Sequence, residues 1–147
     1  MELKPGRDYI GVGVGTVILN GKKEILLVKR SKNSRNETEK WNIPGGAIEF
    51  GEMHFEAAKR EALEETGCEI IPLRLLAVLD YFLEKEKQHW ISFIVEAKIA
   101  KGEPKIMEPE KHDDMKWFPL SKLPKPEEMT MTNNLWLKEI QDGKIKL

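Results

Sequence analysis

Three glutamates in one short stretch of the chain, Glu61, Glu64 and Glu65, have the spacing that most clearly suggests chemistry. On an α-helix, which turns by about 100° per residue, their side chains fall within one arc of about 100°. Like charges at this spacing repel, and the helix dipole disfavours negative charge near the C-terminal end. A divalent cation would offset both costs, because Mg²⁺ prefers oxygen ligands such as carboxylates. The alternative is a solvated acidic face, partly neutralised by Lys59 and Arg60.

The stretch that carries these glutamates, residues 53–66, is expected to be a helix. It contains no glycine or proline, and Gly67 follows it in the place of a C-terminal cap. A helical wheel puts Phe55, Ala58 and Ala62 together on one side, next to the acidic arc. The sequence therefore predicts a half-buried helix with glutamates along one edge.

Most of the remaining chain alternates between strand patterns and polar or proline-rich connections. Strands are expected over residues 9–19, 24–30, 68–83, 89–100 and 112–118. A hairpin turn is expected at Asn20-Gly21 and a hairpin loop at 84–88, with other loops at 31–40 and 102–109, a connector at 119–126 and a last helix over 127–141. Several strands with one central and one C-terminal helix predict an α+β fold or a mixed-sheet sandwich.

Length and composition exclude several classes of protein. The 147 residues suit one domain, 1–147, and 24 basic against 25 acidic side chains argue against a protein that coats nucleic acid. Cys68 is the only cysteine, so an internal disulfide is excluded, and three scattered histidines suggest no zinc cluster. The longest apolar run is too short to span a bilayer, and the N-terminus lacks the apolar core of a signal peptide. A cytoplasmic location without membrane contact is expected.

The glutamate helix and the residues before it resemble a complete Nudix box. That motif reads G-x5-E-x7-R-E-U-x-E-E-x-G-U, where U is apolar, and all seven fixed identities are present from Gly46 through Glu52 to Gly67. The resemblance continues outside the box, over a strand pair ending in Lys29-Arg30, the lead-in WNIPGG at 41–46 and the stretch from Glu110 to Pro124.

Resemblance to this family implies an α/β/α sandwich around a mixed β-sheet. It also implies hydrolysis of nucleoside diphosphates linked to another group, with Mg²⁺ or Mn²⁺ as cofactor. By position in the motif, the metal ligands would be Glu61, Glu64 and Glu65, joined by the backbone carbonyl of Gly45 or Gly46.

Other residues receive expected roles from the same resemblance. Arg60 would orient the glutamates by ion pairing, and Glu52 would support the turn before the helix or join the metal site. The base that activates water stays open between a box glutamate and a later carboxylate. Glu110 is the first candidate outside the box, with Asp113 and Asp114 behind it, and a solvated loop carboxylate is the alternative for Glu110.

The residues expected to contact substrate are Arg30, Gly45, Trp117, Phe118, Asn133 and Asn134. Arg30 would bind phosphate, because planar guanidinium donors suit phosphate oxygens, or it simply ends a surface strand. The two aromatic residues and the two asparagines would contact the nucleobase. Core packing of the aromatic side chains and helix capping by Asn133 are the alternatives.

Segments after the box favour one branch of the family. The downstream proline of the ADP-ribose type and the tyrosine of a dinucleoside polyphosphate type are both missing. The segments EKEKQHW and EPKIMEPEKHDDMKWFPLSKLP are instead similar to the MutT-like nucleotide diphosphatases, a branch that includes thiopurine-nucleotide diphosphatase.

The branch resemblance implies cleavage of (deoxy)nucleoside triphosphates, including oxidised or modified ones, to monophosphate and pyrophosphate, and it allows a homodimer. Three alternatives stay open. They are a pyrophosphatase for ADP-ribose or other linked nucleoside diphosphates, a non-catalytic nucleotide-binding module, and an RNA-end pyrophosphohydrolase.

Overall fold

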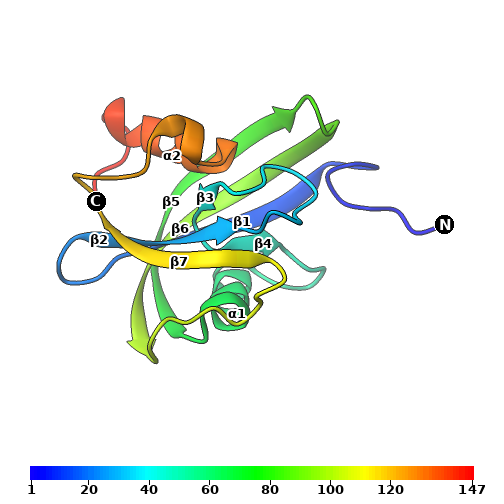
Figure 1. The fold of residues 1–147 in the computed structure, drawn as a ribbon. Coiled ribbons are helices and arrows are strands. Elements are labelled where there is room, and N and C mark those ends of the chain that lie inside the picture. Colours follow the sequence, from blue (N-terminus) through cyan, green and yellow to red (C-terminus); the bar gives the residue numbers. More distant parts are fainter.

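The computed structural model describes residues 1–147 as two β-sheets enclosed between helices (Figure 1). The strands are β1 (Gly11–Ile18), β2 (Glu24–Arg30), β3 (Trp41–Asn42), β4 (Gly45–Ala47), β5 (Glu69–Leu83), β6 (Gln88–Lys101) and β7 (His112–Pro119). The helices are α1 (His54–Thr66), the single 3-10 turn η1 (Pro126–Glu128) and α2 (Met131–Gln141).

One sheet is mixed and the other is antiparallel. The first has the order β4-β1-β6-β5, in which β1 and β6 run parallel and the other pairs run antiparallel. The second has the order β3-β2-β7. With α1 on one side and α2 on the other, this arrangement confirms the α+β class and the α/β/α sandwich (Figure 1).

The core has two parts because successive side chains of a strand point to opposite faces of its sheet. Ile18 of β1 and Leu26 of β2 lie in the cluster beneath α1. Their neighbours Val17 and Leu27 lie in the cluster beneath α2, where Trp136 is fully buried. Strands β1 and β2 therefore hold both helices, and each helix covers one half of the core.

Helix α1 has the bounds that the sequence predicts to within one residue. Gly67 closes it in the left-handed conformation, with φ of 74°, and its N–H donates to the carbonyl of Leu63. No basic side chain stands in the last turn to favour the helix dipole there, and Arg60, one turn earlier, lies 3.4 Å from Glu64.

The expected hairpin at Asn20-Gly21 is wrong, because the strands that it joins lie in different sheets. The side-chain oxygen of Asn20 accepts the N–H groups of Lys22 and Glu24 at 2.9 and 3.0 Å. A single bridge, between Leu19 and Ile25, links the two strands. Asn20 therefore forms a local turn, as the sequence predicts, but tertiary packing places β1 and β2 in different sheets.

The apolar piece at residues 41–46 also crosses between the sheets. Strand β3 pairs with β2, whereas β4 pairs with β1 three residues later. Pro44 lies between them, and its carbonyl accepts the N–H of Thr16 at 2.8 Å. The segment thus brings Gly45 and Gly46 to the edge of the mixed sheet, where α1 can reach them.

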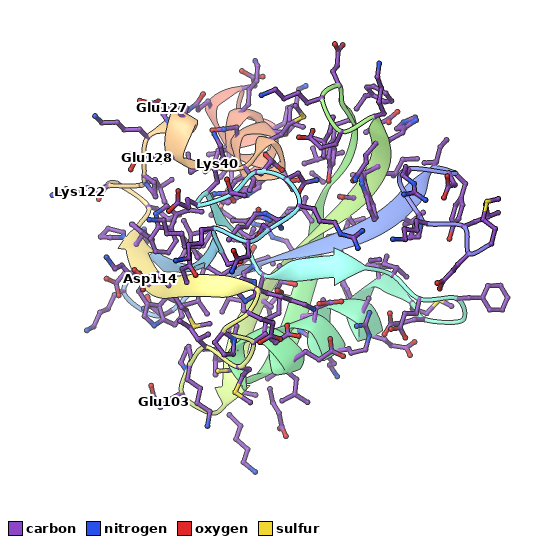
Figure 2. All side chains as sticks on the ribbon, turned by 45° about the vertical axis from the view of Figure 1, so that its right-hand side comes forward. Lys40, Glu103, Asp114, Lys122, Glu127 and Glu128 are labelled. Carbon is purple, nitrogen blue, oxygen red and sulfur yellow. The ribbon has the colours of Figure 1, made fainter.

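The last helix begins at Met131, whereas the sequence predicts that it begins at residue 127. Thr130 caps it, since its hydroxyl accepts the N–H of Asn133. The residues before the cap form η1, and the ammonium group of Lys40 donates to the carbonyl of Glu127 at 2.8 Å. Figure 2 shows Lys40 reaching from the loop after β2 toward Glu127. None of the helices has the length and apolar character that crossing a membrane requires.

Asn133 provides a test of how α2 is held. Its side chain is fully buried, and its oxygen accepts the indole N–H of Trp136 at 2.7 Å. Replacing Asn133 with alanine leaves a buried donor without an acceptor, so we expect the free energy of unfolding to fall by about 2–3 kcal/mol. Chemical denaturation measures this loss.

The matched control is Asn134→Ala, because the Asn134 side chain is partly exposed and donates to the carbonyl of Pro126. This variant should lose less than about 1 kcal/mol. Equal losses in the two variants would contradict the structural role of Asn133.

Candidate active site

The three glutamates of α1 lie at its edge next to strand β4. The side chain of Glu65 is 7% exposed, that of Glu61 is 13% exposed and that of Glu64 is 49% exposed. The N–H of Gly45 donates to Glu65 Oε1 at 2.7 Å. Gly46 lies directly against the carboxylate of Glu61, so any side chain at residue 46 would collide with it. The glycines therefore let β4 approach the acidic edge of the helix.

The Glu61 carboxyl is hard to ionise in this environment. Burial is the main reason that its pKa rises to about 7, and the nearby charge of Glu65 raises this pKa further. The hydrogen bond from Arg60 acts in the opposite direction and does not compensate. Arg60 alone therefore does not offset burial and like charge at the glutamate edge, and a bound divalent cation would relieve this condition.

Arg60 joins the acidic residues to the loop before the helix. Its guanidinium holds both carboxylate oxygens of Glu52, at 2.7 and 2.9 Å, and donates to Glu61 Oε1 at 2.9 Å. It also donates to the carbonyl of Ala47 in β4 at 3.0 Å. Glu64 lies at the edge of this set, 3.4 Å from the guanidinium. One side chain therefore fixes the relative positions of α1, β4 and the connecting loop.

The Arg60–Glu52 pair changes the ionisation of both groups. The hydrogen bonds from Arg60 are the largest cause that lowers the pKa of the Glu52 carboxyl. The same hydrogen bonds are the largest cause that raises the pKa of Arg60. Both side chains are thus charged at neutral pH, as a paired arginine and glutamate should be.

Two residues that the sequence did not suggest lie next to Glu65. His112 Nε2 is 3.1 Å from Glu65 Oε2, and both side chains are buried. Glu108 completes a group in which one ligand atom of each residue lies within 4.8 Å of the others. The other ring nitrogen of His112 is buried without a hydrogen-bond partner. No spacing pattern could reveal this group, because β7 and α1 are brought together by tertiary packing.

Glu110, the expected carboxylate outside the box, is exposed on the turn before β7. Its backbone carbonyl accepts the hydroxyl of Ser31 at 3.0 Å. Asp113 accepts the N–H of Lys32, and Asp114, labelled on β7 in Figure 2, accepts the N–H of the residue that follows it. The structure therefore brings Glu108, rather than these three carboxylates, to Glu65.

A cavity of about 240 Å³ lies beside the glutamate edge. Gly45 and Gly46 form part of its wall, so the same two residues contact both the cavity and the glutamates. Tyr81 and Trp90 give the cavity aromatic surface, and Arg30 lies at its margin. These features provide a slot for a flat apolar group next to a place for anionic groups.

Of the residues expected to contact substrate, Arg30 and Gly45 line the cavity, whereas the two aromatic residues do not. Trp117 packs against the core beneath α1. Phe118 packs edge to face on Trp41, with ring centroids 4.9 Å apart. Neither ring lines the cavity, so the geometry favours the core-packing alternative for both.

The two asparagines of α2 also lie away from the cavity lining. Asn133 is buried against Trp136, and Asn134 is bonded to the backbone at Pro126. The aromatic residues that do line the cavity, Tyr81 and Trp90, stand inside long strands. Their sequence positions carry no signal that separates a cavity wall from ordinary sheet packing.

Comparison with known proteins identifies the family. The model of the NUDIX domain matches residues 10–139, which include the box, the seven strands and the cavity residues. The chain belongs to the Nudix family. The box, with Glu61, Glu64 and Glu65, lies within the matched residues.

Curated relatives match over part of their length. The chain is similar to the 8-oxo-dGDP phosphatase NUDT18 of Mus musculus, with 32% identity over 112 residues that cover 75% of this chain and 32% of the relative. It is similar to an RNA pyrophosphohydrolase of Ruthia magnifica, with 41% identity over 64 residues that cover 44% of this chain and 33% of the relative. The chain thus spans about a third of the length of these relatives.

Solved structures match over nearly the whole chain. A MutT Nudix hydrolase from Burkholderia pseudomallei has a TM-score of 0.77 and 33% identity, and covers 88% of this chain and 97% of its own. A MutT protein from Methanosarcina mazei Go1 has a TM-score of 0.79 and 26% identity, with coverage of 92% and 96%. These matches confirm the MutT-like Nudix fold.

The Arg60–Glu52 pair predicts how stability depends on pH. The pKa of Glu52 is lowered from 4.5 in the folded protein, so the pair stabilises the fold above about pH 4.5 and this contribution is lost as the pH falls through the lower, folded-state value. We expect Glu52→Gln to lower the free energy of unfolding at neutral pH. The difference in the free energy of unfolding between the wild type and this variant should become smaller below about pH 4.5. Urea denaturation across this range measures the difference.

Glu49→Gln is the control, since Glu49 is 68% exposed and lies 3.7 Å from Arg60. Its effect should be small at every pH. A difference for Glu52→Gln that stays constant into strong acid would show that the pair does not act through its charge.

Proposed function

We propose that this Nudix hydrolase is a Mg²⁺-dependent pyrophosphohydrolase of (deoxy)nucleoside triphosphates, including oxidised or modified ones. Its products would be a nucleoside monophosphate and pyrophosphate. The observation that carries the proposal is the position of β4, which has the glutamate edge of α1 on one side and the aromatic cavity on the other. Relatives named as an 8-oxo-dGDP phosphatase and an RNA pyrophosphohydrolase support a nucleotide substrate.

The donor set fits a divalent cation. Glu61, Glu64 and Glu65 supply hard oxygen ligands, and burial together with the charge of Glu65 raises the pKa of Glu61 despite the hydrogen bond from Arg60. In an edge strand, the N–H and C=O of one residue point the same way. Because the Gly45 N–H points to Glu65, its carbonyl also faces α1, which favours Gly45 over Gly46 as a backbone ligand. Mg²⁺ or Mn²⁺ held there would neutralise phosphate charge and lower the pKa of a bound water.

The protein's own side chains would hold the substrate in line with this site. Arg30 is anchored through Nε and Nη2 to the backbone and side-chain oxygens of Asn36, at 3.2 and 2.9 Å. Its remaining terminal nitrogen has no protein acceptor and can bind a phosphate oxygen. Arg60 is engaged by carboxylates and by the carbonyl of Ala47, and would position Glu61 rather than contact substrate.

Glu108 is the better candidate for a carboxylate base outside the box. It lies in one group with Glu65 and His112, whereas Glu110 is exposed on the neighbouring turn. Lys111 pairs with Glu108 at 3.1 Å, and this hydrogen bond is the largest cause that raises the pKa of Lys111. A carboxylate at this place, next to the glutamate edge, could accept a proton from an attacking water.

Removing a ligand charge tests the proposal. Glu65→Gln keeps the shape of the side chain but replaces a carboxylate with a neutral amide, which binds Mg²⁺ weakly. We expect kcat to fall by about 100-fold or more while the melting temperature stays near that of the wild type. Steady-state release of pyrophosphate from triphosphates measures the loss.

Glu56→Gln, on the exposed face of the same helix, is the matched control and should keep full activity. A panel of dNTPs, oxidised dGTP, ADP-ribose and diadenosine polyphosphates completes the experiment. A fully active Glu65→Gln protein in Mg²⁺ would refute the ligand assignment, and a wild-type preference for ADP-ribose would refute the triphosphate substrate.

His112 should affect metal binding through Glu65. In His112→Leu, Glu65 Oε2 loses its ring partner, and Glu65 is left with the N–H of Gly45 as its other anchor. Loss of a residue that orients a ligand typically weakens metal binding by about 10- to 100-fold. Calorimetric titration with Mn²⁺ should show a decrease of this size. Glu110→Gln is the nearby control, and an unchanged Mn²⁺ affinity in His112→Leu would rule out the positioning role.

A further inference from the structure

We propose that the cavity selects nucleobases that carry a carbonyl next to a ring N–H, and discriminates against bases that carry an amino group next to a bare ring nitrogen. The groups that select are the side-chain amides of Asn36, Asn42 and Gln88, which all line the cavity. This inference rests on the proposed function, because it names which triphosphates the site accepts.

The amide of Gln88 is held in one orientation by Trp90. The indole N–H of Trp90 donates to Gln88 Oε1 at 2.9 Å. An indole N–H is a donor only, so it requires the amide oxygen and leaves the NH₂ group of Gln88 directed elsewhere. The indole itself is confined, since it fills the space beside Gly6 and Gly11. No protein acceptor binds the Gln88 NH₂ group, so it is free to donate to a ligand.

The other two amides follow the same rule. Thr130 donates its hydroxyl hydrogen to Asn42 Oδ1 at 2.8 Å, while its oxygen accepts the N–H of Asn133. Arg30 donates to Asn36 Oδ1 at 2.9 Å, and a guanidinium cannot accept a hydrogen bond. Each amide oxygen is thus occupied within the protein, and each NH₂ group is without a protein acceptor.

Glu37 supplies an acceptor among these donors. One of its carboxylate oxygens accepts the N–H of Met131 at 2.7 Å, and the other has no protein partner. Glu37 lines the same cavity. The cavity therefore offers several N–H donors together with one anionic acceptor.

This polarity matches one edge of the nucleobases. Guanine, hypoxanthine, uracil and thymine present a carbonyl next to a ring N–H. The carbonyl needs a donor from the protein, and the ring N–H needs an acceptor. Adenine and cytosine present an amino group next to a ring nitrogen. An amino group placed against an amide NH₂ leaves two donors without an acceptor, and sites of this kind reject such ligands strongly.

The aromatic wall is compatible with this edge-on recognition. The hydroxyl of Tyr81 is engaged by Thr132 at 3.0 Å and by Ser92 at 3.2 Å. These contacts fix the ring, which offers an apolar face to a base without regard to its identity. Discrimination is therefore left to the amides and Glu37.

The test compares substrates that differ at the recognised edge alone. ITP and ATP form a matched purine pair, and UTP and CTP form a matched pyrimidine pair. We expect kcat/KM in Mg²⁺ to favour ITP over ATP and UTP over CTP, each by about 10-fold or more. Gln88→Glu and Asn42→Asp keep the side-chain shape and the bond to Trp90 or Thr130 but replace the NH₂ donor with an acceptor. Each variant should reduce both preferences by about 10-fold.

Gln141→Glu, exposed at the end of α2, makes the same amide-to-acid change away from the cavity and should leave both ratios unchanged. Equal cleavage of ITP and ATP would overturn this inference and leave the proposed function intact. Failure to cleave any triphosphate would instead overturn the proposed function. In that case, calorimetric binding of IMP and AMP decides the preference separately: tighter IMP binding supports it, and equal or tighter AMP binding overturns it.

Discussion

The structure of the site depends on several carboxylates that are held around the guanidinium of Arg60. Arg60 engages Glu52 through two hydrogen bonds and Glu61 through a third, with Glu64 at the margin. A single positive charge cannot neutralise them all, and the pKa of Glu61 remains raised to about 7 by burial and by Glu65. The arrangement is thus rigid but short of positive charge, and both properties suit a site that receives a divalent cation together with a phosphate chain.

Strand β4 turns this charged edge into part of a binding site. Residues 45 and 46 have no side chains, so the strand can pair with β1, approach Glu61 and Glu65, and still border the cavity. Because Pro44 ends the crossing between the two sheets, the glycines arrive at this edge directly from β3. A base in the cavity and phosphates at the glutamates would then be joined across one strand, which brings the reacting bond to a fixed place.

The parts of this arrangement that are local in sequence could be predicted from sequence, and the parts made by tertiary packing could not. The glutamate edge follows from helical spacing within α1, and the cap at Gly67 follows from glycine's access to positive φ. Five of the seven strands are also predicted, but not the short strands β3 and β4, nor the separation of β1 and β2 into different sheets after Asn20. The partners of Glu65, which lie in β7 and in the loop before it, and the cavity walls on β5 and β6 come from distant segments with no shared spacing. Trp117 looked like a base contact because aromatic residues serve both cores and sites, and only its neighbours decide between them.

The polarity of the cavity follows from the same contacts that stabilise the fold. Thr130 caps α2 and also holds the oxygen of Asn42, and the indole that fills the space beside Gly6 and Gly11 also holds the oxygen of Gln88. An amide that is free to rotate can present either its oxygen or its NH₂ group, and it then accepts keto and amino bases alike. Once its oxygen is engaged, rotation costs a buried or partly buried hydrogen bond, and the amide acts as a donor with a fixed direction. The proposed base selection would therefore be a consequence of preorganisation by the fold and would require no net charge on the amides themselves.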